Sequence, residues 1–233
     1  MAMPREYCYR CRRPKELCLC PAKPPMETRT RIVLLMHPME WKREKCTTGR
    51  LTCLNLANSE ILQGIAFDGH PRVRELVDDP GNYPVLLYPG KGAMDITEGG
   101  FPKAELGGRR LVVFLIDSTW SCARSVVRAS PGLMRLPRLA FTPREKSRWV
   151  IKRQPADYCL STLEATHELL LALEAAGLDE YPDKGRLLAA FAAMQAVQVE
   201  RAAANGSPRY LERGDRSRDQ SRGGSCDGTA DGD

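Results

Sequence analysis

Four of the nine cysteines stand close together near the start of the chain, at Cys8, Cys11, Cys18 and Cys20. Two close pairs of thiolates joined by a short loop can surround one tetrahedral metal ion, and zinc is our first choice of ion. An iron–sulfur cluster takes the same four ligands and stays an alternative. Because four protein ligands leave no open position for a substrate, we expect this centre to hold a fold together.

A second group of residues follows the most strongly apolar segment, RLVVFLID at 110–117. A carboxylate at Asp117 can accept a proton or bind an amine or hydroxyl group of a ligand. The side chain of Trp120, three residues later, can stack on a nucleobase or pack beneath the loop. The alternative is that Asp117 caps the following helix and Trp120 anchors that helix in the core.

Other polar positions carry weaker signals. The glycine-rich LYPGKG at 87–92 matches neither standard phosphate-binding loop, so it does not indicate a nucleoside triphosphate. Ser161 and Thr162 precede a long helical segment, and they either cap it or leave backbone groups for a ligand. Glu164 and His167 form a single E-x-x-H pattern, whereas a two-metal carboxylate site needs two copies. We interpret this pair as part of a solvated helix face.

Short apolar runs alternate with helical periods along the chain, and they predict an α/β fold with a mostly parallel sheet and helices on both faces. Ligands bind beyond the carboxyl ends of such strands, which here lead into HPMEWKRE, LYPGKG and DSTWSCARS. Predicted strands cover 31–36, 64–69, 83–90, 110–117 and 138–142. Predicted helices cover 46–58, 71–79, the segment after 119, 160–177 and 182–204.

Charge is segregated along the chain, whose overall net charge is +6. Residues 1–50 carry a net charge of +7 and residues 121–153 carry +8, while the remaining segments are acidic. This pattern predicts a basic surface for a polyphosphate partner such as RNA, the alternative being a basic face that contacts only solvent.

Apolar runs fall short of the roughly 18 residues of a membrane-spanning helix, and the N-terminus lacks a signal-peptide pattern. We therefore expect a cytoplasmic protein with no membrane partner.

The composition divides the chain into three parts. We expect a four-cysteine metal-binding module at 1–28 and one catalytic or binding domain at 29–204. The last segment, 205–233, is rich in Gly, Ser, Arg and Asp and poor in apolar residues. Such a segment buries too little surface to order itself, so we expect a disordered tail.

Together these motifs resemble the DTW-domain family, whose namesake motif is carried here with one insertion at 117–120. The resemblance also rests on the opening cysteine pattern, HPMEWKREKCTTGRL, LLYPGKG and YCLSTLEATHELL, and so spans nearly all of residues 7–200. It implies a SPOUT-like fold with a C-terminal trefoil knot. The implied activity is transfer of the 3-amino-3-carboxypropyl group of S-adenosylmethionine to N3 of a uridine in tRNA, which releases methylthioadenosine.

The resemblance also implies roles for particular residues. Asp117 is the candidate general base for the uridine, or else it fixes the amino group of the transferred chain. Trp120 stacks on the target base or forms a wall of the pocket. The residues implied in S-adenosylmethionine binding are Leu87, Tyr88, Pro89, Gly90, Ile116, Ser118, Thr119, Tyr158, Leu160, Ser161 and Thr162.

For tRNA we expect arginine and lysine contacts to phosphates, which give affinity without sequence choice. The candidates are Arg10, Arg12, Arg13, Arg43, Arg50, Arg124, Arg128, Arg135, Lys152 and Arg153. Two other functions stay open: an RNA methyltransferase that uses the same cofactor, and a zinc-containing RNA-binding module without catalysis. The sequence leaves the oligomeric state open.

Overall fold

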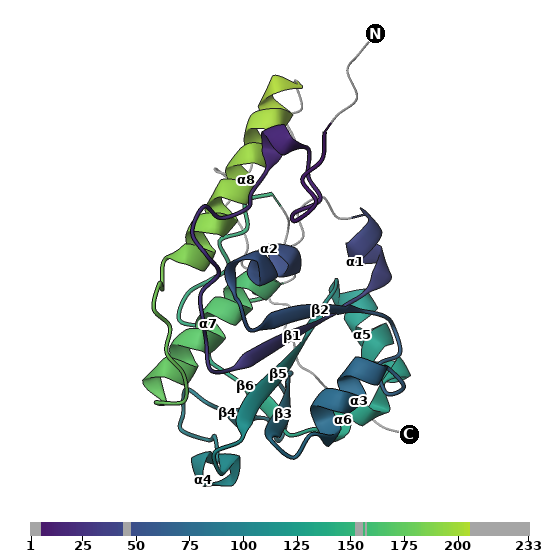
Figure 1. Ribbon diagram of the computed structural model, residues 1–233, viewed down its shortest axis with the longest axis vertical. Helices are drawn as coiled ribbons and strands as arrows, with labels where there is room; N and C mark the ends of the chain where they lie inside the picture. Colours follow the sequence, from purple (N-terminus) through teal and green to yellow (C-terminus); the bar gives the residue numbers. More distant parts are fainter. Residues whose placement is uncertain (1–5, 44–47, 152–155, 157, 206–233) are drawn as a thin grey trace.

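The computed structural model describes residues 6–43, 48–151, 156 and 158–205 (Figure 1). Its six strands form one sheet in the order β2-β1-β5-β3-β6-β4, and all five neighbouring pairs are parallel. The prediction of a mostly parallel sheet is therefore confirmed. The strands are β1 (Arg31–Met36), β2 (Ser59–Gln63), β3 (Asn82–Leu87), β4 (Met94–Asp95), β5 (Arg110–Asp117) and β6 (Arg138–Ala140).

Strand β5 lies at the centre of the sheet, between β1 and β3. Met36, the last residue of β1, is in register with Asp117, the last residue of β5. On the other side Leu86 of β3 is in register with Phe114. Because the strands are parallel, the segments that follow β1, β3 and β5 all leave from the same edge of the sheet.

Side chains of β5 point alternately into two separate apolar cores. Val113 and Leu115 pack beneath α2, α7 and α8, whereas Val112 and Phe114 pack beneath α3, α5 and α6. The predicted coverage of both faces is thus confirmed, and Figure 1 shows the two helix layers. These helices are α2 (Thr48–Asn55), α3 (Pro71–Asp78), α5 (Trp120–Ala129), α6 (Pro131–Arg135), α7 (Thr162–Ala175) and α8 (Arg186–Ala204).

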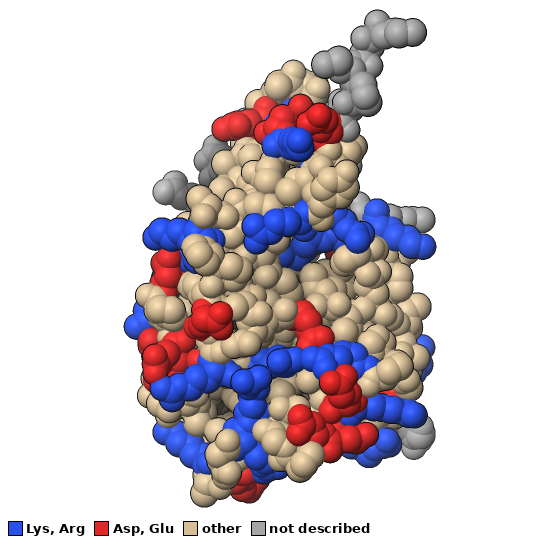
Figure 2. Space-filling view, in the orientation of Figure 1, with Lys and Arg blue, Asp and Glu red and all other residues tan. Residues whose placement is uncertain are grey.

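Three short helices complete the described elements: the 3-10 helix η1 (Lys15–Leu17), α1 (Pro38–Arg43) and α4 (Lys103–Leu106). Basic side chains gather in two bands across the face drawn in Figure 2, one level with α2 and one across the lower half of that view. Within the described residues, every helix is too short or too polar to cross a membrane.

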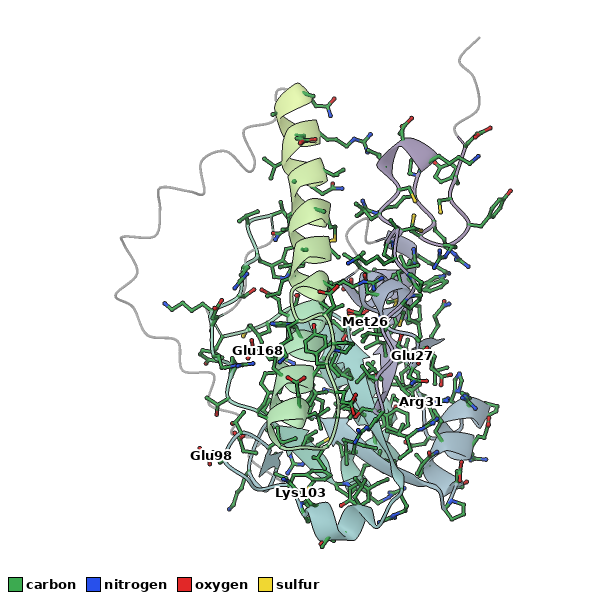
Figure 3. All side chains as sticks on the ribbon, turned by 60° about the vertical axis from the view of Figure 1, so that its left-hand side comes forward. Met26, Glu27, Arg31, Glu98, Lys103 and Glu168 are labelled. Carbon is green, nitrogen blue, oxygen red and sulfur yellow. The ribbon has the colours of Figure 1, made fainter. Side chains whose placement is uncertain are left out.

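The cysteine-containing segment lies beside α2 and the long α8, as Figures 1 and 3 show. Met26 is buried where this segment joins the rest of the chain, and its backbone N–H donates to the carbonyl of Asn55 at 2.8 Å. Arg186 at the start of α8 donates from Nη2 to the carbonyl of Lys23 at 2.9 Å. The segment is therefore attached to the main domain by hydrogen bonds to its backbone at its C-terminal end.

The structure corrects the predicted strand at 64–69. Those residues form a loop that buries Phe67 in the second core, and the strand lies earlier, at Ser59–Gln63. This edge strand has polar residues at Ser59, Glu60 and Gln63, so it lacks the apolar run used to recognise a strand. The predicted helix at 46–58 begins among the described residues at Thr48 and ends at Asn55. The short elements α1, α4, α6 and β4 carry little periodicity and were not predicted.

We predict that Asp179→Ala lowers the free energy of unfolding by about 3 kcal/mol, because one buried and two partly buried backbone N–H groups lose their acceptor. Asp179 is buried, and its carboxylate accepts from the backbone N–H of Arg29 at 2.7 Å, of Thr30 at 2.9 Å and of Glu180 at 2.7 Å. Urea unfolding measures the effect. The matched control is Glu180→Ala, which removes an exposed ion pair with Arg29 and should cost less than about 1 kcal/mol. Equal costs for the two variants would contradict the prediction.

Candidate functional site

The carboxylate of Asp117 is held where strand β5 meets helix α7. Asp117 is only 7% exposed, and its Oδ1 accepts a hydrogen bond from Oγ1 of Thr162 at 2.7 Å. Thr162 is the first residue of α7. The hydrogen bond therefore brings together two segments that the family resemblance assigned to one ligand site, although they lie 45 residues apart.

The first turn of α2 packs against the same carboxylate. A methyl group added at Gly49 would lie 2.8 Å from Cγ of Asp117 and closer still to Oδ2, so only glycine fits there without a shift. Asp117 thus lies at the first turns of both α2 and α7. The partial positive charge at a helix N-terminus attracts a carboxylate, which helps to fix its position.

The alternative capping role for Asp117 is not the one observed. Helix α5 begins at Trp120, and its N-cap is Thr119. Asp117 precedes the capping position by two residues and instead accepts from Thr162. The side chain of Trp120 lies outside the described part of the structure, so both of its predicted roles stay predictions.

Ser161 is the N-cap of α7 and forms a capping box with Glu164. Its Oγ accepts from the backbone N–H of Glu164 at 3.2 Å, and Glu164 Oε2 accepts from the backbone N–H of Ser161 at 2.8 Å. The capping role suggested by the sequence is therefore confirmed. The box sets the direction in which α7 leaves the loop and so positions Thr162 against Asp117.

Our interpretation of Glu164 and His167 as a solvated helix face is wrong. Glu164 is 3% exposed and His167 is 7% exposed, because the chain around Arg148 crosses over this face of α7. The backbone N–H of Arg148 donates to Glu164 Oε1 at 2.6 Å, and Ser147 Oγ donates to Oε2 at 3.0 Å. The S-x-x-E spacing of the capping box was the signal that could have located Glu164.

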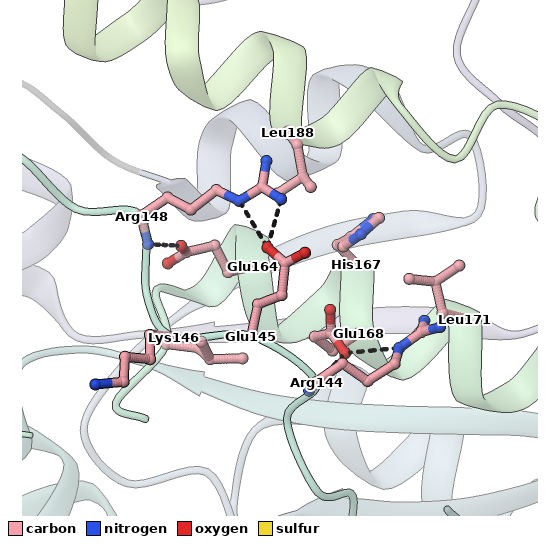
Figure 4. A pocket seen from close by; sticks show the side chains of 10 residues that line it. Arg144, Glu145, Lys146, Arg148, Glu164, His167, Glu168, Leu171 and Leu188 are labelled. Carbon is pink, nitrogen blue, oxygen red and sulfur yellow. Dashed lines mark hydrogen bonds and ion pairs between the residues drawn. The ribbon is translucent and has the colours of Figure 1, made fainter. Parts of the chain in front are cut away.

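A cavity of about 190 Å³ lies beside this crossing, between α7 and the chain at 144–148 (Figure 4). Its charged walls already pair with one another, since Arg144 Nε donates to Glu168 at 3.3 Å and Arg148 to Glu145 at 2.5 Å. His167 Nδ1 lies 3.0 Å from the hydroxyl of Tyr181, and burial lowers the pKa of His167. These contacts favour a role in holding α7 in place.

The segment after β3 reaches the same edge of the sheet as Asp117. Tyr88 donates its backbone N–H to the carbonyl of Leu139 at 3.0 Å, which extends the ladder between β3 and β6. Gly90 has a φ of 135°, a conformation that favours glycine. Leu160 is half-buried and Tyr158 is 53% exposed, just before α7. Which of these residues contact a cofactor stays a prediction.

The four clustered cysteines come together as the sequence predicts. All four Sγ atoms lie within 4.8 Å of one another, with Cys8 and Cys20 at 3.6 Å and Cys11 and Cys18 at 3.7 Å. A tetrahedral ion with metal–sulfur bonds of about 2.3 Å places its ligand sulfurs about 3.8 Å apart, so the spacing fits one metal ion. A multi-iron cluster requires a wider set of sulfurs, because its ligands lie outside the cluster.

The electrostatics of the cluster also suit a cation. Hydrogen bonds from the backbone N–H groups of Cys11 and Arg10 lower the pKa of Cys8 to about 6, which favours the thiolate that binds metal. Burial raises the pKa of Cys20, and a bound cation would offset that cost of ionisation. The residues present therefore fit a structural metal ion.

Two arginines predicted to contact RNA meet at Trp41 of α1. The guanidinium of Arg12, from the cysteine segment, and that of Arg50, from α2, each lie 4.4 Å from the centre of the Trp41 ring. A guanidinium over an indole face is attracted by the ring's electron density. This cluster of Arg12, Trp41 and Arg50 links the cysteine segment to the helix that packs on Asp117.

The other described arginines predicted for RNA lie on one helix layer, that of α5 and α6, and on the cysteine segment. Arg124 and Arg128 are exposed on α5, and Arg135 is exposed on α6, whereas Arg10 is exposed on the cysteine segment. The structure does not bring these two groups into direct contact among its described residues. The side chain of Arg43, and all of Lys152 and Arg153, lie outside the described residues.

We predict one tightly bound metal ion per chain, measurable by elemental analysis of the purified protein. Cys11→Ser should abolish this stoichiometric binding, because Cys11 is a buried ligand within the cluster. Cys53→Ser is the matched control, since Cys53 lies outside the cluster and packs against the main core. Loss of metal in both variants, or in neither, would show that the cluster is not the metal site.

We predict that Gly49→Ala destabilises the protein by about 1–3 kcal/mol in urea unfolding, because the added methyl group overlaps the Asp117 carboxylate. Gly69→Ala is the control, since nothing lies within 4 Å of a methyl group there. The double variant Gly49→Ala with Asp117→Ala should recover part of the loss, which a double-mutant cycle measures. Strictly additive losses would contradict a contact between the two residues.

Known proteins resemble this chain over most of its length. The DTW domain matches residues 5–199. A Drosophila melanogaster protein named tRNA-uridine aminocarboxypropyltransferase 2 is 32% identical over 176 residues, which are 73% of this chain and 67% of that protein. The Mus musculus protein of the same name is 32% identical over 73% of this chain but only 57% of its own length. An Arabidopsis thaliana protein, tRNA-uridine aminocarboxypropyltransferase A, is 26% identical over 74% of each chain.

Solved structures provide no significant match to this chain. The family match covers the cysteine cluster, the three segments at the carboxyl edge of the sheet and the capped start of α7. Membership of this family was expected from the motif at 117–120 and from the order of the other motifs, and that expectation is confirmed. The chain belongs to the DTW-domain family.

Proposed function

We propose that this protein is an enzyme that transfers the 3-amino-3-carboxypropyl group of S-adenosylmethionine to N3 of a uridine in tRNA. The observation that carries the proposal is the position of the family motif. The motif begins at the last residue of the central strand, where Asp117 contacts Thr162 and the first turn of α2. The names of the relatives in fly, mouse and plant support the same reaction class.

The reaction defines what the site must do. S-adenosylmethionine supplies an electrophilic carbon next to a positively charged sulfur. N3 of the uridine loses its proton and forms a bond to that carbon, while the carbon–sulfur bond breaks and methylthioadenosine leaves. Because N3 carries a proton in neutral uridine, a nearby carboxylate such as Asp117 can act as the general base. In the alternative role, Asp117 holds the amino group of the transferred chain.

Thr162 is a positioning residue in either role. Its hydroxyl donates to Oδ1 of Asp117 at 2.7 Å, which leaves the orientation of the carboxylate little freedom. The cofactor would be held by Leu87, Tyr88, Pro89 and Gly90 after β3, by Ile116, Ser118 and Thr119 around the end of β5, and by Tyr158, Leu160, Ser161 and Thr162 before and at the start of α7.

The remaining parts of the proposal concern the metal, the fold and the partner. We assign zinc to Cys8, Cys11, Cys18 and Cys20, because four thiolates at this spacing suit a tetrahedral ion. We assign residues 1–28 to the metal module and 29–204 to the catalytic domain, with a SPOUT-like relationship and a C-terminal trefoil knot. The tail at 205–233 lies almost wholly outside the described residues.

The exposed arginines of the cysteine segment, α5 and α6 are the proposed phosphate contacts to tRNA. A cytoplasmic location stays a prediction.

The test is an assay with unmodified bulk tRNA and S-adenosylmethionine labelled separately on its methyl and aminocarboxypropyl carbons. We expect the aminocarboxypropyl label in RNA together with released methylthioadenosine. Methyl label in RNA would identify a methyltransferase instead. Neither label, with tRNA still bound, would identify a non-catalytic RNA-binding module.

Asp117→Asn provides the mechanistic control in the same assay, because the amide keeps the shape of the carboxylate and removes its basicity. We expect turnover to fall about 100-fold or more with tRNA affinity retained. A tRNA carrying 5-fluorouridine, whose N3 proton is more acidic, should restore part of this loss if Asp117 is the base. Loss without such rescue would favour the amino-group role, and full activity would remove Asp117 from the mechanism.

A further inference from the structure

Arg50 is held in an environment that is unusual for an arginine that contacts RNA phosphates. It is half-buried in the first turn of α2, and its guanidinium lies 4.4 Å from the centre of the Trp41 ring. Its Nη2 is buried and makes no hydrogen bond within the described part of the chain. A buried donor left unsatisfied costs roughly 1–3 kcal/mol, so such a group in a native protein calls for an explanation.

The surroundings of Arg50 indicate that the missing partner is an anion. Burial, followed by the positive charges of Arg12 and Arg13, lowers the pKa of Arg50, while Cys11 and Asp117 act in the opposite direction. A cation that is desolvated beside other cations is stabilised by a bound anion. A guanidinium also presents paired N–H groups that match the two oxygens of a carboxylate.

The position of Arg50 relative to Asp117 narrows the choice of anion. Gly49 precedes Arg50 directly, and the turn that carries both packs on the Asp117 carboxylate. The Asp117 carboxylate thus packs on the turn of α2 that carries Arg50, and its charge acts on the pKa of the Arg50 guanidinium. These two charges complement an α-amino acid, which carries an ammonium and a carboxylate on one carbon.

We propose that Arg50 binds the carboxylate at the amino-acid end of S-adenosylmethionine, on the chain that is transferred, so that Arg50 and Asp117 form an amino-acid-binding subsite. This inference rests on the proposed function and adds to it a substrate-binding residue. Arg50 was expected to contact an RNA phosphate, and the subsite replaces that role. Trp41 holds the guanidinium, and Arg12 of the metal module lies 4.4 Å from the centre of the same ring.

Two nucleosides that differ at the amino-acid end provide the test. S-adenosylhomocysteine carries the amino acid, whereas methylthioadenosine lacks it, and calorimetry measures the affinity of each without RNA or turnover. Arg50→Gln should weaken S-adenosylhomocysteine binding about 10- to 100-fold, as expected for loss of a hydrogen bond between charged groups. Binding of methylthioadenosine should be unchanged, which also shows that the variant is folded.

Arg109→Gln is the matched control, because Arg109 also stacks on an aromatic ring, 4.8 Å from the centre of Tyr83, but next to the opposite end of β5. The Arg109→Gln variant should bind both nucleosides with the affinity of the unmodified chain. Arg50→Lys should recover only part of the affinity, since an ammonium cannot bind a carboxylate through two parallel hydrogen bonds.

Several results would overturn the inference. If Arg50→Gln weakens both nucleosides equally or neither, the subsite is wrong while the proposed function stands. If Arg50→Gln weakens only tRNA binding, Arg50 is a phosphate contact. If the unmodified chain binds neither nucleoside, the proposed function and the subsite both fail.

Discussion

The position of one carboxylate, Asp117, constrains most of the structure around the proposed site. Asp117 is the last residue of the central strand, and its carboxylate accepts a hydrogen bond from Thr162, the first residue of α7. At position 49, in the first turn of α2, the carboxylate leaves room only for glycine. A strand and two helices from distant parts of the sequence therefore share one fixed point. Because packed interiors tolerate little change in volume, a shift of any of the three elements displaces the other two.

The metal module has a different source of stability. Among its described residues, Cys11 and Met26 are the buried apolar side chains, and one of them is a proposed metal ligand. A segment with so little apolar burial does not order itself by the hydrophobic effect, and four metal–thiolate bonds can supply the missing free energy. Once ordered, the module places Arg12 against Trp41. Metal binding and the geometry of Arg50 are linked in this way, although the metal lies outside the proposed site.

The sequence predicted those features that depend on neighbours along the chain. Strand β5 was predicted to the residue because its apolar run is continuous, whereas β2 was missed because an edge strand has few buried positions. Burial of Glu164 was not foreseen because it depends on the chain around Arg148, 16 residues away. The contact of Arg12 and Arg50 with Trp41 is likewise invisible in a periodicity or a motif.

The arginines of this protein separate into two classes with different physical roles. Exposed side chains such as Arg124 and Arg128 keep their hydration and suit phosphates, which are contacted without sequence choice. Arg50 has lost much of its hydration and is held against a ring, so it suits an anion with one fixed position. Contacts to the adenosine part of the cofactor cannot decide which of the carbons on the sulfur is attacked. That choice requires the protein to orient the amino-acid end. The Arg50 cation, on the turn of α2 that packs on the Asp117 anion, is suited to that task.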